Sequence, residues 1–254
     1  MGLNVLKGVA VSNNRKYGRG LQFVEEGFAE CWSNADTLIH ASELLLTGGF
    51  HAPSLSLSVL ALEEMGKLFL IDGLLFAKQD DQKSEVFQKG QRSHNIKLAA
   101  IPMISAVTVH VASADPRFKF EREFKIALSI AHETWKASAQ SVLNMAGEAD
   151  FQFLDGWKQK GFYVSLVNGN SFRSPESVID RSAAQSVFAF AKLSKGNLNF
   201  ALSDGNLRRY IDRAWTIRSK LSESDHATLE EAATVICDQL FEGIDGEASQ
   251  SRNS

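Results

Sequence analysis

The chain has little proline and almost no strand pattern. Only four prolines occur in 254 residues. Strict alternation of apolar and polar residues, which marks a half-buried strand, is nearly absent. Apolar residues recur instead at three- and four-residue steps, as they do along one face of an α-helix. The sequence therefore predicts an all-α fold and argues against one built on sheets.

Cysteine and net positive charge are also scarce. The two cysteines, Cys31 and Cys237, lie in helical apolar patterns, which predicts buried thiols in a reducing compartment. A net charge of −3 supplies no overall positive field for nucleic acid. The first twenty residues are too short and too broken by glycine to cross a membrane. We expect a cytoplasmic protein without a membrane partner.

Familiar catalytic motifs are missing. Gly66-Lys67 lies inside an apolar helix without the glycine-rich loop that binds phosphates. The segment 132–136 begins like a zinc-binding helix, but Lys136 stands where the second histidine is required. No cluster of cysteine and histidine replaces it. We therefore expect no metal and no cofactor.

Helical periodicity covers most of the chain. Helices at 21–47 and 51–78, separated by Gly48-Gly49, predict an antiparallel hairpin. The predicted bundle has six to seven helices; the others span 84–113 with a kink at Pro102, 119–147, 176–200, 206–221 and 226–242. Residues 21–245 are expected to form a single domain, preceded by an extension at 1–20 and followed by a disordered tail at 246–254.

One segment, 148–177, lacks an obvious helical period. It is punctuated by glycine and rich in aromatic residues, so we expect a long ordered loop that packs on the bundle, with an extended piece at 162–166. It carries Lys158, which can meet a carboxylate such as Glu63 or Glu64. The loop can be a structural lid or part of the functional site.

The helix at 51–78 is apolar nearly all round, yet it carries Glu63, Glu64 and Lys67 in its middle. Buried charges are costly unless they are paired and hydrogen-bonded. In a structural interpretation Glu63 pairs with Lys67 along the helix, and Glu64 serves a neighbouring helix. In a functional interpretation the cluster faces a cleft and binds or transforms a ligand.

The next helix carries Arg92, His94 and Lys97. His94 can be a structural histidine, or it can act on a phosphodiester with the two cations beside it. Because the charges of the 51–78 helix need partners, we expect the two helices to lie side by side and to bring Glu63, Glu64 and Lys67 near His94 and Lys97.

Three motifs give the chain a family resemblance. They are Glu-Glu-x-Gly-Lys at 63–67, Ser-His-x-x-Lys-Leu at 93–98 and Lys-x-x-Gly-Phe-Tyr-Val at 158–164. Together with the small and leucine residues that precede the first motif, they resemble the AbiV family of bacterial abortive-infection proteins over roughly residues 25–200. Ser165 departs from the family pattern, in which an acidic residue often follows the third motif.

The resemblance implies a HEPN-like helical bundle that pairs as a homodimer and defends against phage. Such an effector arrests growth or translation once a phage component arrives, by contact with a phage protein, a translation component or RNA. Many HEPN proteins are instead ribonucleases with an arginine four to six residues before a histidine. Arg92 and His94 are closer than that, which leaves a variant metal-independent site as the alternative. Its expected members are His94, Glu63, Glu64 and Lys67, with binding by Arg92, Lys97, Lys158 and Tyr163.

The leucine content of the two central helices also favours a homodimer. Residues 55–76 carry apolar groups on more sides than one helical hairpin can cover. We therefore expect a second copy to cover part of that surface.

Overall fold

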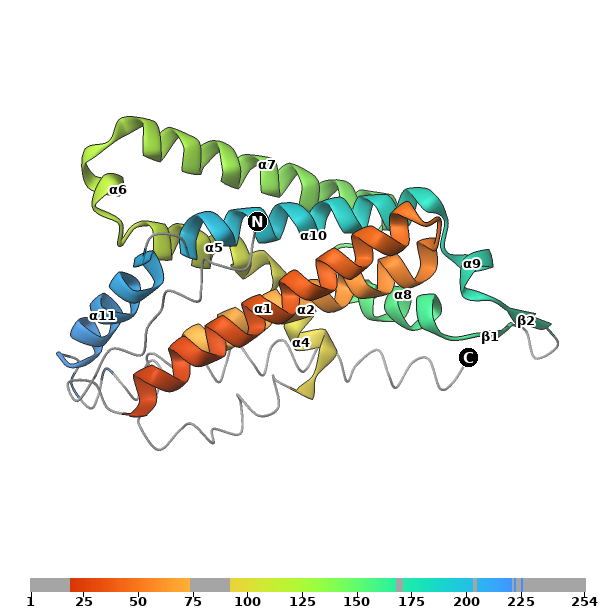
Figure 1. Cartoon of the computed structure of the whole chain (residues 1–254), viewed down its shortest axis with the longest axis horizontal. Helices are drawn as coiled ribbons and strands as arrows, with labels where there is room; N and C mark the ends of the chain where they lie inside the picture. Colours follow the sequence, from red (N-terminus) through yellow and green to blue (C-terminus); the bar gives the residue numbers. More distant parts are fainter. Residues whose placement is uncertain are drawn as a thin grey trace.

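Two long helices, α1 (Arg19–Thr47) and α2 (His51–Gly73), form an antiparallel hairpin in the middle of the protein (Figure 1). The computed structural model describes residues 19–73, 92–167, 171–202, 205–220, 222 and 225. Gly49 adopts a φ of 83°, and the amide of Phe50 donates a 2.9 Å hydrogen bond to the carbonyl of Leu45. This turn closes the end of α1 as expected from the two glycines.

Helix α2 is the centre of the bundle. Every side chain described on it is buried or half-buried. It contacts α1 on one side, α10 (Arg181–Leu202) on another, and α8 (Phe153–Phe162), α5 (Ile101–Ala112) and α4 (His94–Ala99) around the rest. The core therefore surrounds α2, which is why its sequence is apolar on all sides.

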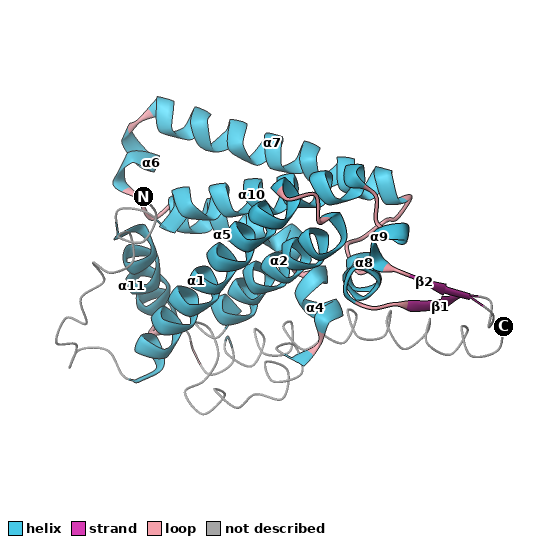
Figure 2. Cartoon of the chain, turned by 45° about the vertical axis from the view of Figure 1, so that its right-hand side comes forward, coloured by secondary structure: helices cyan, strands magenta, loops and turns pink. Residues whose placement is uncertain are grey.

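The other elements form an outer layer. Helix α7 (Arg122–Ala146) packs on α10, away from α2, and the short α6 (Pro116–Phe120) precedes it (Figure 1). Helix α11 (Asn206–Arg218) contacts α5, α10 and α1. An antiparallel hairpin of β1 (Ser165–Val167) and β2 (Ser171–Arg173) projects from the bundle beside α8, and α9 (Pro175–Val178) leads from it into α10 (Figure 2). The all-α prediction is confirmed.

Two of the predicted helix boundaries are wrong. The helix expected at 84–113 is divided at Ala100 into α4 and α5, so that Pro102 starts a new helix where a kink was expected. Proline is tolerated in a first turn because its missing N–H needs no partner there. The helix expected at 119–147 is likewise preceded by α6, separated from it by the extended backbone of Glu121.

The prediction of a long aromatic loop at 148–177 is also wrong. Most of it is α8, the β-hairpin and α9. Phe151 is buried and stacks on Phe190 at 5.2 Å, which agrees with the expected packing on the bundle. Phe162, Tyr163 and Phe172 are exposed, so half of the aromatic side chains do not pack down.

The apolar sides of α2 are covered by helices of the same chain. The homodimer remains a prediction, but it no longer follows from surplus leucine on that helix. In the part of the chain that the structure describes, no helix is both long and apolar enough to span a bilayer. The helix predicted at 226–242, Cys237, residues 1–18 and the tail at 246–254 lie outside the described residues. So do the end of the predicted helix 51–78, at 74–78, and the start of the predicted helix 84–113, at 84–91.

Candidate functional site

Glu63 is the centre of a charged cluster inside the bundle. It lies on α2 and is 2 % exposed. Its Oε1 accepts a 2.6 Å hydrogen bond from Lys158 Nζ on α8. Its Oε2 lies 2.6 Å from His94 Nδ1 and 3.3 Å from Lys97 Nζ, both on α4. Three segments of the chain therefore meet at one carboxylate, as Figure 2 indicates by the neighbouring positions of α2, α4 and α8.

The cations of the cluster are as deeply buried as the carboxylate. Lys97 is 5 % exposed and Lys158 is 3 % exposed. Removing an ion pair from water costs several kcal/mol per ion, which only close opposite charges and good hydrogen bonds can offset. Each buried lysine here has a carboxylate within 3.3 Å. The cluster is thus balanced internally, and its members depend on one another.

Two glycines of the motifs allow the helices to come this close. A Cβ on Gly66 of α2 would clash with the carbonyl of Lys97 on α4. A Cβ on Gly161 of α8 would clash with the Ser56 hydroxyl on α2. That hydroxyl donates a 2.9 Å hydrogen bond to the carbonyl of Lys158. Glycine is therefore required at both positions by helix packing, and the charges lie beside these two contacts.

Glu64 and Lys67 form a separate pair. Lys67 Nζ lies 2.6 Å from Glu64 Oε1, one helical turn away. The predicted pairing is therefore reversed, because Glu63, expected to pair with Lys67, serves the neighbouring helices instead. Cys31 on α1 borders this second pair and is only half-buried, not fully buried as predicted. Burial, and then the negative charge of Glu64, raise the pKa of its thiol to about 11.

His94 is the one member of the Glu63 cluster with a largely accessible side chain, 46 % exposed. It is the first residue of α4, and the Ser93 hydroxyl caps that helix by accepting from the amide of Ile96. Because a carboxylate can only accept, Nδ1 carries the hydrogen and donates to Glu63. In the neutral ring Nε2 is then an acceptor without a partner among the described residues, which is the arrangement of a histidine oriented for acid–base chemistry.

The structure brings together most of the expected residues but not all. His94, Lys97 and Lys158 surround Glu63 as predicted, and Glu64 with Lys67 lies on the adjoining part of α2. Arg92 is exposed, and no hydrogen bond or ion pair joins it to the described residues. Tyr163 is 63 % exposed, just after the end of α8.

Asp155 belongs to the charged cluster, although the sequence did not indicate it as a site residue. Its Oδ1 lies 2.6 Å from Lys158 Nζ, an ion pair without hydrogen-bond geometry. The i,i+3 spacing of the two residues on a helix would have indicated the pair. The spacing carries this meaning only on a helix, and the apolar pattern of this segment predicts a loop.

Three potential metal ligands converge in the cluster. One ligand atom each from Glu63, His94 and Asp155 lies within 4.8 Å of the others. The Lys158 ammonium, however, is 2.6 Å from both Glu63 Oε1 and Asp155 Oδ1. It supplies the positive charge that a metal ion would bring, and an ion could bind both carboxylates only by displacing it. The donor set is therefore better suited to the lysine than to a metal.

The three sequence motifs thus meet in space at the carboxylate of Glu63. The first motif lies on α2, the second at α4 and the third at the end of α8. Compared with known protein families, the chain matches the family described as AbiV over residues 23–195, which includes all three motifs. No curated protein and no solved structure matches it.

Proposed function

The chain belongs to the AbiV family of HEPN-like proteins, and from that premise we propose that it is a cytoplasmic effector of abortive infection that arrests growth or translation through contact with a protein or RNA. Membership of this family indicates a role in phage defence. Toxin-like arrest and the nature of the contact are the proposed part.

The burial of the motif charges carries this proposal. Glu63, Lys97 and Lys158 are at most 5 % exposed, and both lysines pair with the Glu63 carboxylate. A substrate cannot reach groups so deeply buried without unfolding of α4 or α8. The motifs are therefore best explained as an internal clamp that fixes these two helices on α2. Contact with a phage protein, a translation component or RNA is left to the exposed groups around it, Arg92, His94 and Tyr163.

A second candidate is a metal-independent ribonuclease, and the pairing of His94 with Glu63 favours it. A histidine whose Nδ1 donates to a buried carboxylate can exchange protons through Nε2 on its exposed side. Lys67, with a side chain 21 % exposed, is the most accessible of the three lysines that define the motifs and could meet a phosphate. In this alternative Arg92 would help to bind the phosphodiester.

Phage challenge of cells that produce wild type, His94→Ala or the control His40→Ala separates the two candidates. His40 is exposed on α1 and lies outside the motifs. Protection without new RNA 5′ ends relative to an empty vector, measured by total-RNA end sequencing, supports an effector that acts by contact. New ends in wild type and His40→Ala that vanish in His94→Ala, at unchanged melting temperature, contradict it and support the ribonuclease.

We include a homodimer in the proposal, since HEPN-like bundles usually pair. Light scattering at micromolar concentration should give twice the 27.9 kDa mass of one chain. A mass of one chain under these conditions would remove the dimer from the account without affecting the rest.

A further inference from the structure

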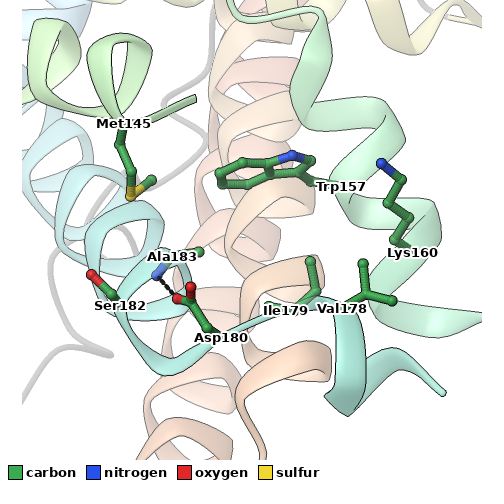
Figure 3. A pocket seen from close by; sticks show the side chains of 8 residues that line it. All are labelled: Met145, Trp157, Lys160, Val178, Ile179, Asp180, Ser182 and Ala183. Atoms are coloured by element: carbon green, nitrogen blue, oxygen red, sulfur yellow. Dashed lines mark hydrogen bonds between the residues drawn. The ribbon is translucent and has the colours of Figure 1, made fainter. Parts of the chain in front are cut away.

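A pocket lies on the side of α8 that faces away from the Glu63 cluster. It has a volume of about 280 Å³ and lies where the end of α7, the outer face of α8, α9 and the start of α10 come together (Figure 3). Pockets for small ligands begin at roughly 300 Å³, so this one lies just below that range and suits only a small ligand, no larger than a dipeptide.

The wall of the pocket is mixed: aromatic and aliphatic side chains lie beside polar ones, and the polar groups expose more of its surface. Trp157 of α8 lies along one side, opposite Ile179 and Val178, and Met145 of α7 closes a further side (Figure 3). The indole ring is held edge-on against Phe153 at 5.0 Å between ring centroids. A fixed aromatic ring beside aliphatic side chains suits an apolar side chain of a ligand.

Two side chains of opposite charge, Asp180 and Lys160, line the pocket beside these groups without pairing to each other. Asp180 precedes α10, and its Oδ1 accepts a 2.7 Å hydrogen bond from the amide of Ala183. This contact fixes the carboxylate and leaves Oδ2 without a partner among the described residues. Lys160, on α8 across the pocket, is exposed and has no ion pair with any described residue (Figure 3).

We propose that this pocket binds a short zwitterion of the dipeptide type. The ammonium group of the ligand meets Asp180 and its carboxylate meets Lys160, while an apolar side chain packs on Trp157 and Ile179. A simple anion is disfavoured, because the Asp180 carboxylate already occupies the N-terminus of α10. A simple cation offers no negative charge to the Lys160 ammonium. A ligand with opposite charges at its two ends can pair with both Asp180 and Lys160.

Such a ligand would act on the same helix that holds the motif cluster. Trp157 and Lys160 face the pocket, whereas Lys158 between them points to Glu63 on α2. Occupancy of the pocket would therefore stabilise α8 in its position on α2. The proposal does not depend on whether the protein acts by contact or by cleaving RNA.

The test uses the full-length protein and the dipeptide Ala-Phe, together with N-acetyl-Ala-Phe and Ala-Phe amide, each of which lacks one charge. Binding is followed by the NMR signal of the Trp157 indole N–H, assigned with Trp157→Phe. Wild type should bind Ala-Phe about fivefold more tightly than either capped form, the size of one partly exposed ion pair.

Two variants assign each charge. Asp180→Asn keeps a side chain that can cap α10, and it should no longer distinguish Ala-Phe from the acetylated form. Lys160→Met should no longer distinguish Ala-Phe from the amide. Lys136→Met, an exposed lysine of α7 paired with Glu133, is the control and should bind as wild type. Absence of any Trp157 shift at millimolar Ala-Phe, or equal affinity for all three ligands, would overturn the proposal.

Discussion

The ammonium of Lys158 lies 2.6 Å from the carboxylate of Glu63, across 95 positions of sequence, and both side chains are less than 5 % exposed. This pair joins α8 to the central helix of the bundle. Because Lys97 and His94 approach the other oxygen of the same carboxylate, α4 is fixed at the same point. The three motifs, which lie within the region that matches the family, therefore hold three helices together.

Removal of the central carboxylate should be strongly destabilising. Glu63→Gln leaves the buried Lys97 without an anion and Lys158 with Asp155 alone, and breaking a buried pair in this way costs about 3–5 kcal/mol. Glu64→Gln is the matched control, since its pair with Lys67 is partly exposed and is worth about 1 kcal/mol or less. Urea unfolding measures both changes. Equal losses of unfolding free energy in the two variants would show that Glu63 contributes no more to stability than the partly exposed Glu64.

The glycines of α8 should respond in opposite ways to the same substitution. Gly161→Ala places a Cβ against Ser56 and the carbonyl of Ala52, so it should lower the melting temperature and loosen α8. Gly156→Ala meets nothing within 4 Å and should raise stability by about 0.5–1 kcal/mol through helix propensity. Calorimetry measures the melting temperatures of the two variants. If both substitutions stabilise the protein, α8 does not approach α2 as closely as described.

Asp115 should make stability depend on pH at the acid end. Hydrogen bonds from Arg117 lower the pKa of this carboxyl to about 2, from about 4 in an unfolded chain. Its contribution is thus complete above about pH 4 and is lost as the pH falls towards 2. Asp115→Asn, which can still cap α6, should be less stable than wild type by about 1–2 kcal/mol at pH 7, since solvent partly screens the pair.

The difference between wild type and Asp115→Asn should then shrink between pH 4 and pH 2. Unfolding curves at several pH values provide the measurement. A difference that stays constant over this range would show that the charge of Asp115 contributes nothing.

Cys31 should react slowly with alkylating reagents. With its thiol pKa raised to about 11, little thiolate is present at pH 8. Glu64→Gln removes a negative charge that contributes to this shift and should speed alkylation several-fold in a Cys237→Ser background. Glu133→Gln, on the distant α7, serves as the control. Fast alkylation of wild type, or no effect of Glu64→Gln, would contradict the described surroundings of the thiol.

Periodicity in the sequence was sufficient to predict α1, α2 and the hairpin between them, because each helix carries a continuous apolar pattern and glycine marks the turn. The meeting of His94 and Lys97 with the charges of α2 was also predictable, since buried charges need partners. The choice of partner was not. Whether Glu63 or Glu64 faces the neighbouring helices depends on the exact rotation of α2, which packing against α4 and α8 sets.

Helix α8 shows why a segment can escape prediction. Its inward positions are Leu154, Lys158 and Gly161, which follow steps of four and three as on any packed helix face. Two of the three are not apolar, so a search for apolar periodicity finds no helix. Lysine is there to meet Glu63 and glycine to allow close approach, and both reasons depend on α2 rather than on the local sequence.

The most direct test of this account is a double-mutant cycle between Glu63→Gln and Lys158→Met, measured by urea unfolding. If the two side chains form the buried pair that joins α8 to α2, the double variant should be about 1–3 kcal/mol more stable than the sum of the single losses predicts. Additivity within about 0.5 kcal/mol would contradict the pair, and with it the claim that the motifs form one internal clamp.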